Sequence, residues 1–145
     1  LLLQSSDDIK FSIKNFKIVS KIKPTRKVLN NLIFAFNICR FVKSNAIVLT
    51  HRGTTVGIGS GQPSRLDSCK IAIDKLKKFN SDINGEILAA SDAFFPFVDG
   101  IETLVQSGVT AVIQPSGSVR DKEIIKYANE TGTILVFSKS RHFNH

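Results

Sequence analysis

Some stretches of the chain have apolar residues at the spacing typical of helices, and others have the short apolar runs typical of strands. Residues 27–42 carry apolar side chains at helical spacing, and Thr25 is suited to cap the start of the predicted helix. Further helices are predicted at residues 64–79, 101–107 and 121–130, and Gly132 is suited to end the last one. Apolar runs predict strands at residues 46–50, 54–58, 87–90, 109–113 and 133–137, with a bend at 51–53.

Residues 10–22 alternate apolar and basic side chains, which favours half-buried extended structure until Pro24 ends the run. Strands that alternate with helices after residue 46 predict an α/β domain, a three-layer sandwich with a mixed, largely parallel sheet. Neither a repeat nor a linker divides the chain. We therefore expect one domain at residues 24–145, with residues 1–23 as a partial lead-in.

The composition is that of an ordinary globular domain, because 145 residues suffice to bury a core. Cys39 and Cys69 lie in predicted helices and form no Cys-x-x-Cys motif. We interpret them as buried free thiols of a protein in a reducing compartment. Apolar runs stay well short of the roughly 20 residues of a membrane span, and the start does not resemble a signal peptide. We expect a cytoplasmic protein with no membrane partner, and a piece of a longer polypeptide because the chain contains no methionine.

The net charge of +8 is concentrated at the front, where residues 1–45 hold nine Lys or Arg against two acids. These lysines are not interleaved with aromatic residues at stacking spacing, so we interpret them as a solvated face and expect no nucleic-acid partner. The alternative is a noncatalytic α/β domain that binds a nucleotide or nucleic acid through residues 10–27. Such binding would depend strongly on salt.

The turn at residues 91–99 follows a predicted buried strand and is the most unusual stretch of the chain. Two carboxylates flank three phenylalanines and a proline there, namely Asp92, Phe94, Phe95, Pro96, Phe97 and Asp99. Ligands bind at the carboxyl ends of strands in open α/β sheets, and an apolar wall with a few polar groups suits a flat heterocycle. The alternative is a core turn with two capping aspartates.

Other turns after strands also carry candidate chemistry. Residues 59–65 form a glycine-rich loop that leads into a helix start and could favour an anion, or could be a tight turn. Asn45 could offer a donor and an acceptor to a ligand, or cap the joint in which it lies. Arg141 in the tail is suited to a phosphate, unless the tail is only a disordered terminus.

Three catalytic patterns are absent from the sequence: the zinc deaminase motif, metal-spaced Cys and His residues, and Gly-x-Ser-x-Gly. No complete catalytic constellation is visible, and we expect no catalytic metal.

Several of these segments, in order, resemble the C-terminal part of the bifunctional purine-biosynthesis enzymes that carry aminoimidazole carboxamide ribonucleotide formyltransferase and inosine monophosphate cyclohydrolase. The segments are residues 43–48, 57–62 with Ser64 and Arg65, 91–97 with Asp99 and Gly100, 114–118, and 141–145. The resemblance covers the chain from about residue 24 to its end. Two departures from the family pattern are Val98 in place of a basic residue and Asn30–Asn31 in place of an acidic pair.

The resemblance implies a cytidine-deaminase-like subdomain without zinc, in a homodimer whose active site lies near the subunit interface. It implies transfer of a formyl group from the cosubstrate 10-formyltetrahydrofolate to the 5-amino group of aminoimidazole carboxamide ribonucleotide. By analogy, Asn45 and the Phe94 backbone hold the carboxamide, Arg141 binds the 5′-phosphate, and Arg65 with Asp99 lies on the folate side. Further substrate-binding residues are expected at Asp92, Phe94, Phe95, Phe97 and His145.

In this resemblance the proton-transfer Lys-His pair and the cyclohydrolase domain lie upstream of residue 1. Asn45 is then the one residue with a catalytic role here, through positioning, and we expect the isolated chain to be inactive or nearly so. Whether a monovalent cation binds is left open by the sequence.

Overall fold

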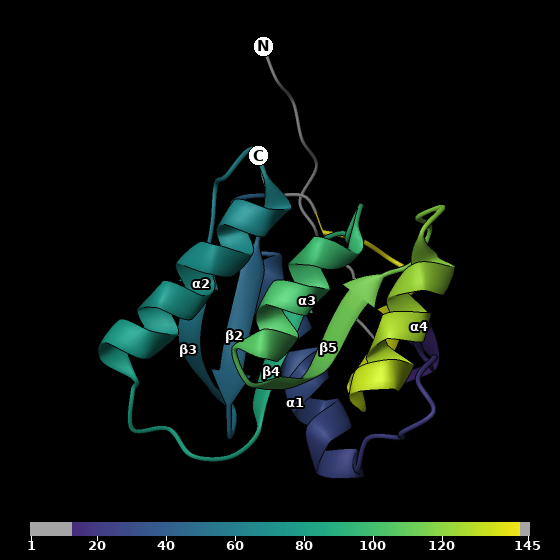
Figure 1. Ribbon diagram of the computed structural model, residues 1–145, viewed down its shortest axis with the longest axis horizontal. Helices are drawn as coiled ribbons and strands as arrows, with labels where there is room; N and C mark the ends of the chain where they lie inside the picture. Colours follow the sequence, from purple (N-terminus) through teal and green to yellow (C-terminus); the bar gives the residue numbers. More distant parts are fainter. Residues whose placement is uncertain (1–12, 143–145) are drawn as a thin grey trace.

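The computed structural model describes residues 13–142, which form a six-stranded mixed sheet with helices on both faces (Figure 1). A 3-10 turn at Ile13–Asn15 opens the described chain. The strands are β1 (Phe16–Ile18), β2 (Ile47–His51), β3 (Thr54–Gly59), β4 (Ile87–Ser91), β5 (Val109–Pro115) and β6 (Ile134–Ser138). The helices are α1 (Arg26–Cys39), α2 (Arg65–Phe79), α3 (Val98–Gln106) and α4 (Asp121–Thr131).

The sheet has the strand order β1-β6-β5-β4-β2-β3. β4, β5 and β6 are parallel, β2 is antiparallel to both β3 and β4, and β1 is antiparallel to β6. Four strands, β3 to β6, therefore run in one direction while β1 and β2 run in the other. The predicted α/β class and the mixed, mostly parallel sheet are confirmed.

The sheet separates two apolar clusters. α1 packs on one face, over β2, β4 and β5, with Leu32 and Phe36 fully buried. α2, α3 and α4 lie side by side on the other face, where Phe95 and Leu104 belong to the buried cluster (Figure 1). The arrangement is the predicted three-layer sandwich.

The helix boundaries follow capping chemistry that the sequence predicts well. The Thr25 side chain accepts a hydrogen bond from the Val28 N–H at 3.2 Å, as expected, and Gly132 ends α4 in a left-handed conformation with φ of 70°. α1 ends at Cys39 rather than residue 42, because the N–H groups of Phe41 and Val42 bond to carbonyls three residues back and tighten the last turn. α3 begins at Val98, three residues before the predicted start.

The strand predictions needed two corrections. Within residues 10–22, only Phe16–Ile18 is a strand, and residues 10–12 lie outside the described part. The regular ladder ends there because the Leu135 N–H donates to the buried Ser20 hydroxyl and not to a backbone carbonyl, while the Leu135 carbonyl still accepts from the Val19 N–H. β5 continues through Gln114 and Pro115, which were predicted to lie in a turn, because both pair with β6.

The backbones of β3 and α2 lie in close contact. Gly57 and Gly59 lie directly against the helix, and a Cβ atom at Gly59 would overlap the Ser68 carbonyl oxygen. The absence of side chains at these two positions lets the helix rest on the strand. This contact fixes the start of α2, where Arg65 lies, relative to the sheet.

Candidate functional site

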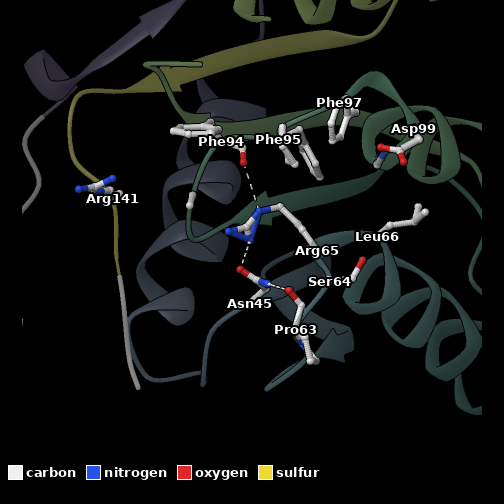
Figure 2. A pocket seen from close by; sticks show the side chains of 13 residues that line it. Asn45, Pro63, Ser64, Arg65, Leu66, Phe94, Phe95, Phe97, Asp99 and Arg141 are labelled. Atoms are coloured by element: carbon white, nitrogen blue, oxygen red, sulfur yellow. Dashed lines mark hydrogen bonds between the residues drawn. The ribbon is translucent and has the colours of Figure 1, made fainter. Parts of the chain in front are cut away.

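A pocket of about 520 Å³ opens beside the end of β4, between the first turns of α2 and α3 (Figure 2). It brings together four segments that are distant in sequence: the joint before β2, the start of α2, the Phe-rich turn and the tail. Its lining residues are Asn45, Pro63, Ser64, Arg65, Leu66, Ala93, Phe94, Phe95, Pro96, Phe97, Asp99, Gly100 and Arg141. Seven of the nine residues predicted for a site therefore line one hollow.

The Asn45 side chain is fixed by both of its ends. Its amide nitrogen donates to the carbonyls of Gln62 and Pro63, each at 2.9 Å, and its oxygen accepts from Arg65 Nη1 at 3.0 Å. The peptide bond that joins it to Ser44 is cis. Since both amide hydrogens are in use, the side chain can offer a ligand only the second lone pair of its oxygen.

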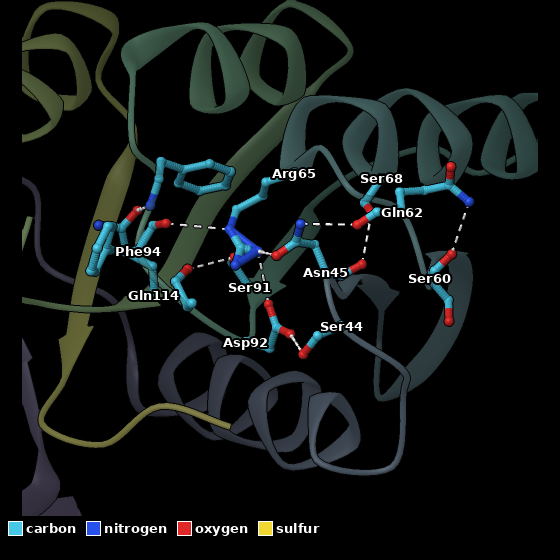
Figure 3. A network of polar contacts seen from close by, with 12 residues as sticks. Ser44, Asn45, Ser60, Gln62, Arg65, Ser68, Ser91, Asp92, Phe94 and Gln114 are labelled. Atoms are coloured by element: carbon cyan, nitrogen blue, oxygen red, sulfur yellow. Dashed lines mark hydrogen bonds and ion pairs between the residues drawn. The ribbon is translucent and has the colours of Figure 1, made fainter. Parts of the chain in front are cut away.

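Arg65, the first residue of α2, is 8% exposed and bonds to three different segments (Figure 3). Besides Asn45, its Nη1 donates to Asp92 Oδ1 at 2.9 Å and its Nε to the Phe94 carbonyl at 3.3 Å. Burial lowers the pKa of the guanidinium, and the negative charge of Asp92 opposes that shift. The guanidinium stays charged, because arginine side chains remain protonated in proteins.

Asp92 does not line the pocket but lies fully buried behind Arg65. Its Oδ1 accepts from Arg65, and its Oδ2 accepts from the Ser44 hydroxyl at 2.5 Å. Its backbone N–H and C=O bond to Ala46 and His142. The position therefore offers no free face to a ligand, unlike the other carboxylate of the turn.

The three phenylalanines of the turn have three different environments. Phe94 is half-buried in the pocket wall, whereas Phe95 is 1% exposed and packs in the core against Gly100. Phe97 is 55% exposed, and the guanidinium of Arg120 lies 5.2 Å from the centre of its ring. Only Phe94 and Phe97 thus have surface to offer a flat ligand.

Asp99 and Arg141 lie at opposite sides of the opening (Figure 2). Asp99 is exposed in the first turn of α3, where Oδ1 accepts from the Gly100 N–H at 2.7 Å. Arg141 is exposed, and the next residue, His142, anchors the tail with its N–H on Asp92 and its ring 4.7 Å from that of Phe36. His145 lies outside the described residues.

The glycine-rich loop at residues 59–65 is used as a structural turn. The Gly61 N–H donates to Lys43 C=O at 2.9 Å, and the Gln62 carbonyl accepts from the Asn45 N–H. Ser64 accepts from the Asp67 N–H and caps α2. These contacts hold the Asn45 joint against the start of α2, which favours the tight-turn interpretation over an anion site.

Two residues of the site were missed by the sequence reasoning. Ser44 bonds to Asp92, and its position beside Asn45 in a polar joint was the available signal. Gln114 is fully buried at the end of β5 and accepts from the Phe95 N–H at 3.4 Å. A glutamine that directly follows the apolar run of a central strand could have indicated this contact.

Residues 13–142 contain no group of three His, Cys, Asp or Glu side chains placed to hold a metal ion. In the same range, the helices all fall short of the length and apolar character needed to cross a membrane.

The fold and the pocket define a three-layer α/β domain with a pocket at the end of β4, which has buried polar groups on one side and an exposed cation on the other. Residues 1–75 match the family model for the AICARFT/IMPCHase bienzyme. The chain therefore belongs to the AICARFT/IMPCHase bienzyme family, as its motifs predicted.

Similar proteins over the full chain are bifunctional purine biosynthesis proteins PurH. Identity is 45% over 99% of the chain for the protein of Aquifex aeolicus, and 47% over 100% for that of Buchnera aphidicola subsp. Schizaphis graminum. The Neisseria meningitidis serogroup C protein is 46% identical over 100% of the chain. The chain spans only 27 to 28% of the length of these relatives.

Proposed function

We propose that this chain forms the ribonucleotide-binding part of a folate-dependent formyltransferase of purine biosynthesis. In this proposal it corresponds to the C-terminal part of the longer relatives. The reaction moves a formyl group from 10-formyltetrahydrofolate to the 5-amino group of aminoimidazole carboxamide ribonucleotide. The observation that carries the proposal is that Asn45, Phe94 and Arg141, from three separate segments, line one pocket.

The proposed substrate suits the hydrogen-bonding capacity of the pocket wall. The Asn45 amide oxygen and the Phe94 carbonyl each accept one bond from Arg65, which leaves each oxygen a second lone pair. Both can therefore accept an N–H group, such as those of a carboxamide. The half-buried Phe94 ring offers apolar surface to the imidazole.

Charge at the opening supports the placement of the other groups. Arg141 is exposed and can pair with the 5′-phosphate through its planar fork of donors. We assign Asp99 and the pocket side of Arg65 to the folate, since Asp99 lies at the opposite side of the opening. Phe97 borders the same side with an exposed ring.

The chemical step needs groups that this pocket does not supply. The amine nitrogen attacks the formyl carbon, the bond from that carbon to the folate nitrogen breaks, and a proton leaves the amine while one reaches the folate. Neither His nor Lys lines the pocket among residues 13–142. We therefore assign proton transfer to a Lys-His pair outside this chain, and expect the chain alone to bind ribonucleotide without formylating it.

The proposal also includes properties that rest on the family resemblance alone. These are a cytidine-deaminase-like ancestry without zinc, a homodimer, and a cytoplasmic location.

Calorimetric titration with aminoimidazole carboxamide ribonucleotide tests the proposal. We expect binding that Arg141→Ala weakens at least about tenfold, because a charge-assisted pair to the phosphate is lost. Lys139→Ala is the matched control, since it removes one exposed charge from the same tail but does not line the pocket. An equal loss in both variants would contradict the phosphate assignment, and a folded wild-type chain that does not bind would contradict a ribonucleotide site held by this chain alone.

A further inference from the structure

Arg65 owes its orientation to one buried carboxylate. The guanidinium donates to Asn45 and to the Phe94 carbonyl on the pocket side, and both are neutral acceptors. Among residues 13–142, the ion pair with Asp92 is its one charged contact, and the two side chains are 7% and 1% exposed. A charge-assisted hydrogen bond is roughly twice as strong as a neutral one, so this contact dominates the placement of the guanidinium.

Asp92 is itself held from several directions. The Ser44 hydroxyl donates to Oδ2, so that the carboxylate cannot rotate without losing either Ser44 or Arg65. The Asp92 N–H donates to the carbonyl of Ala46, just before β2, and the Asp92 carbonyl accepts from the N–H of His142, the residue after Arg141 in the tail. The residue thus joins the two sides of the pocket, although it does not line the pocket itself.

We propose that Asp92 is a positioning residue for this pocket, whose carboxylate, steadied by Ser44, fixes Arg65 in the orientation that also holds Asn45 and Phe94. This changes the role expected from the sequence, where Asp92 was a direct substrate contact. Polar side chains that are already held in place lose less conformational entropy when a ligand binds. The affinity therefore depends on Asp92 even though Asp92 does not contact the ligand. The consequence for ribonucleotide affinity rests on the proposed function, whereas the effect on Arg65 does not.

The first measurement is hydrogen exchange of the Arg65 Nε–H, observed by NMR in the ligand-free chain and assigned by its loss in Arg65→Lys. In the wild type we expect slow exchange, because the group is buried and bonded to Phe94. Asp92→Asn keeps the size of the side chain and removes its charge, and we expect exchange to rise about tenfold. Ser44→Ala, which leaves the carboxylate in place, should raise exchange by about threefold.

Loss of stability alone is excluded by a matched control. Ser20→Ala removes a buried hydrogen bond to Leu135 and a part-buried one to Ile22 at the far end of the sheet, so it destabilises the fold without touching Arg65. All variants are measured at one pH and one temperature, well below the lowest of their melting temperatures. We expect the Ser20→Ala exchange rate to equal that of the wild type, and unchanged exchange in Asp92→Asn would overturn the proposal.

The second measurement is calorimetric affinity for aminoimidazole carboxamide ribonucleotide in the same variants. We expect a loss of about tenfold for Asp92→Asn, about threefold for Ser44→Ala and none for Ser20→Ala. Wild-type affinity retained in Asp92→Asn would overturn the proposal. If the folded wild type does not bind, the proposed function fails for this chain, and the exchange measurement still decides whether Asp92 positions Arg65.

Discussion

The two arginines that line the pocket differ in burial and in how they are held. Arg65 is 8% exposed, begins a helix that rests on the sheet, and bonds to Asn45, Asp92 and Phe94. Arg141 is exposed in the irregular tail after β6 and is anchored by the next residue, His142. A pocket can thus be lined by an arginine that is buried and bonded within the fold, or by one that is exposed on its surface. Mutation of the first should reduce stability, whereas mutation of the second should not.

The largest effect on stability is expected for Arg65→Met. Removal of one partner leaves the carboxylate of Asp92 buried without its charge partner, which costs about 3–5 kcal/mol of unfolding free energy in urea denaturation. Arg120→Met is the control, because the Arg120–Glu123 pair is exposed and is expected to contribute at most about 1 kcal/mol. Similar losses in the two variants would remove the distinction between buried and exposed arginines.

Gly59→Ala tests whether the helix that carries Arg65 depends on close contact with the sheet. The added Cβ meets the backbone oxygen of Ser68, which cannot move away as a side chain could. We expect a loss of about 3 kcal/mol in urea denaturation, at the upper end of the cost of overpacking. Thr55→Ala on the same strand is exposed and should change stability by no more than about 0.5 kcal/mol. A Gly59→Ala variant as stable as this control would contradict the tight packing.

Cys69 extends the comparison to pH, because it lies one helical turn beyond Arg65. Burial raises its pKa to about 12 from an ordinary value of 9.0, while Arg65 lowers it. The folded thiol therefore keeps its proton after the unfolded one has lost it, so the stabilisation is complete below pH 9 and is lost as the pH rises toward 12. Between pH 9 and pH 12, the unfolding free energy of the wild type should therefore fall with pH more steeply than that of Cys69→Ala. The expected difference between the two slopes is about 1.4 kcal/mol per pH unit. Equal slopes in urea denaturation at several pH values would show that Cys69 does not titrate as expected.

The smallest effect on stability is expected for Arg141→Ala, which removes an exposed side chain from the tail. We expect a change within about 0.5 kcal/mol by urea denaturation, in contrast to its effect on ribonucleotide binding. His142→Ala, at the next position, should cost about 2 kcal/mol or more, because its ring is fully buried against Phe36. A large loss for Arg141→Ala would mean that both walls of the pocket are part of the fold.

The same contrast explains which features could be predicted from the sequence. Local signals, such as the Thr25 cap, Gly132 and the repeat of apolar residues, report interactions within a few residues and gave the elements correctly. The bond between Ser20 and Leu135 joins residues far apart in sequence, so its effect on the length of β1 was not predictable from the pattern. β5 was also longer than predicted, because its pairing with β6 extends to Pro115.

Most residues of the pocket were named from the sequence, but the directions in which they point were not predicted. Asn45, Phe94, Asp99 and Arg141 line the same pocket. Asp92 and Phe95 belong to the same motif but are buried, because Asp92 pairs with Arg65 and Phe95 packs in the apolar core. Sequence spacing alone does not say which acidic or aromatic residue of such a turn faces the ligand.

The antiparallel pairing of β1 with β6 has a consequence for the order in which the protein assembles. Phe16 pairs with Ser138, so the first strand of the described chain cannot pair within the sheet until the last strand has formed. The main chain of Asp92 likewise binds His142, which is made much later. Contacts of such long range close slowly, and a nascent chain on the ribosome can complete neither this sheet edge nor the pocket until β6 has emerged.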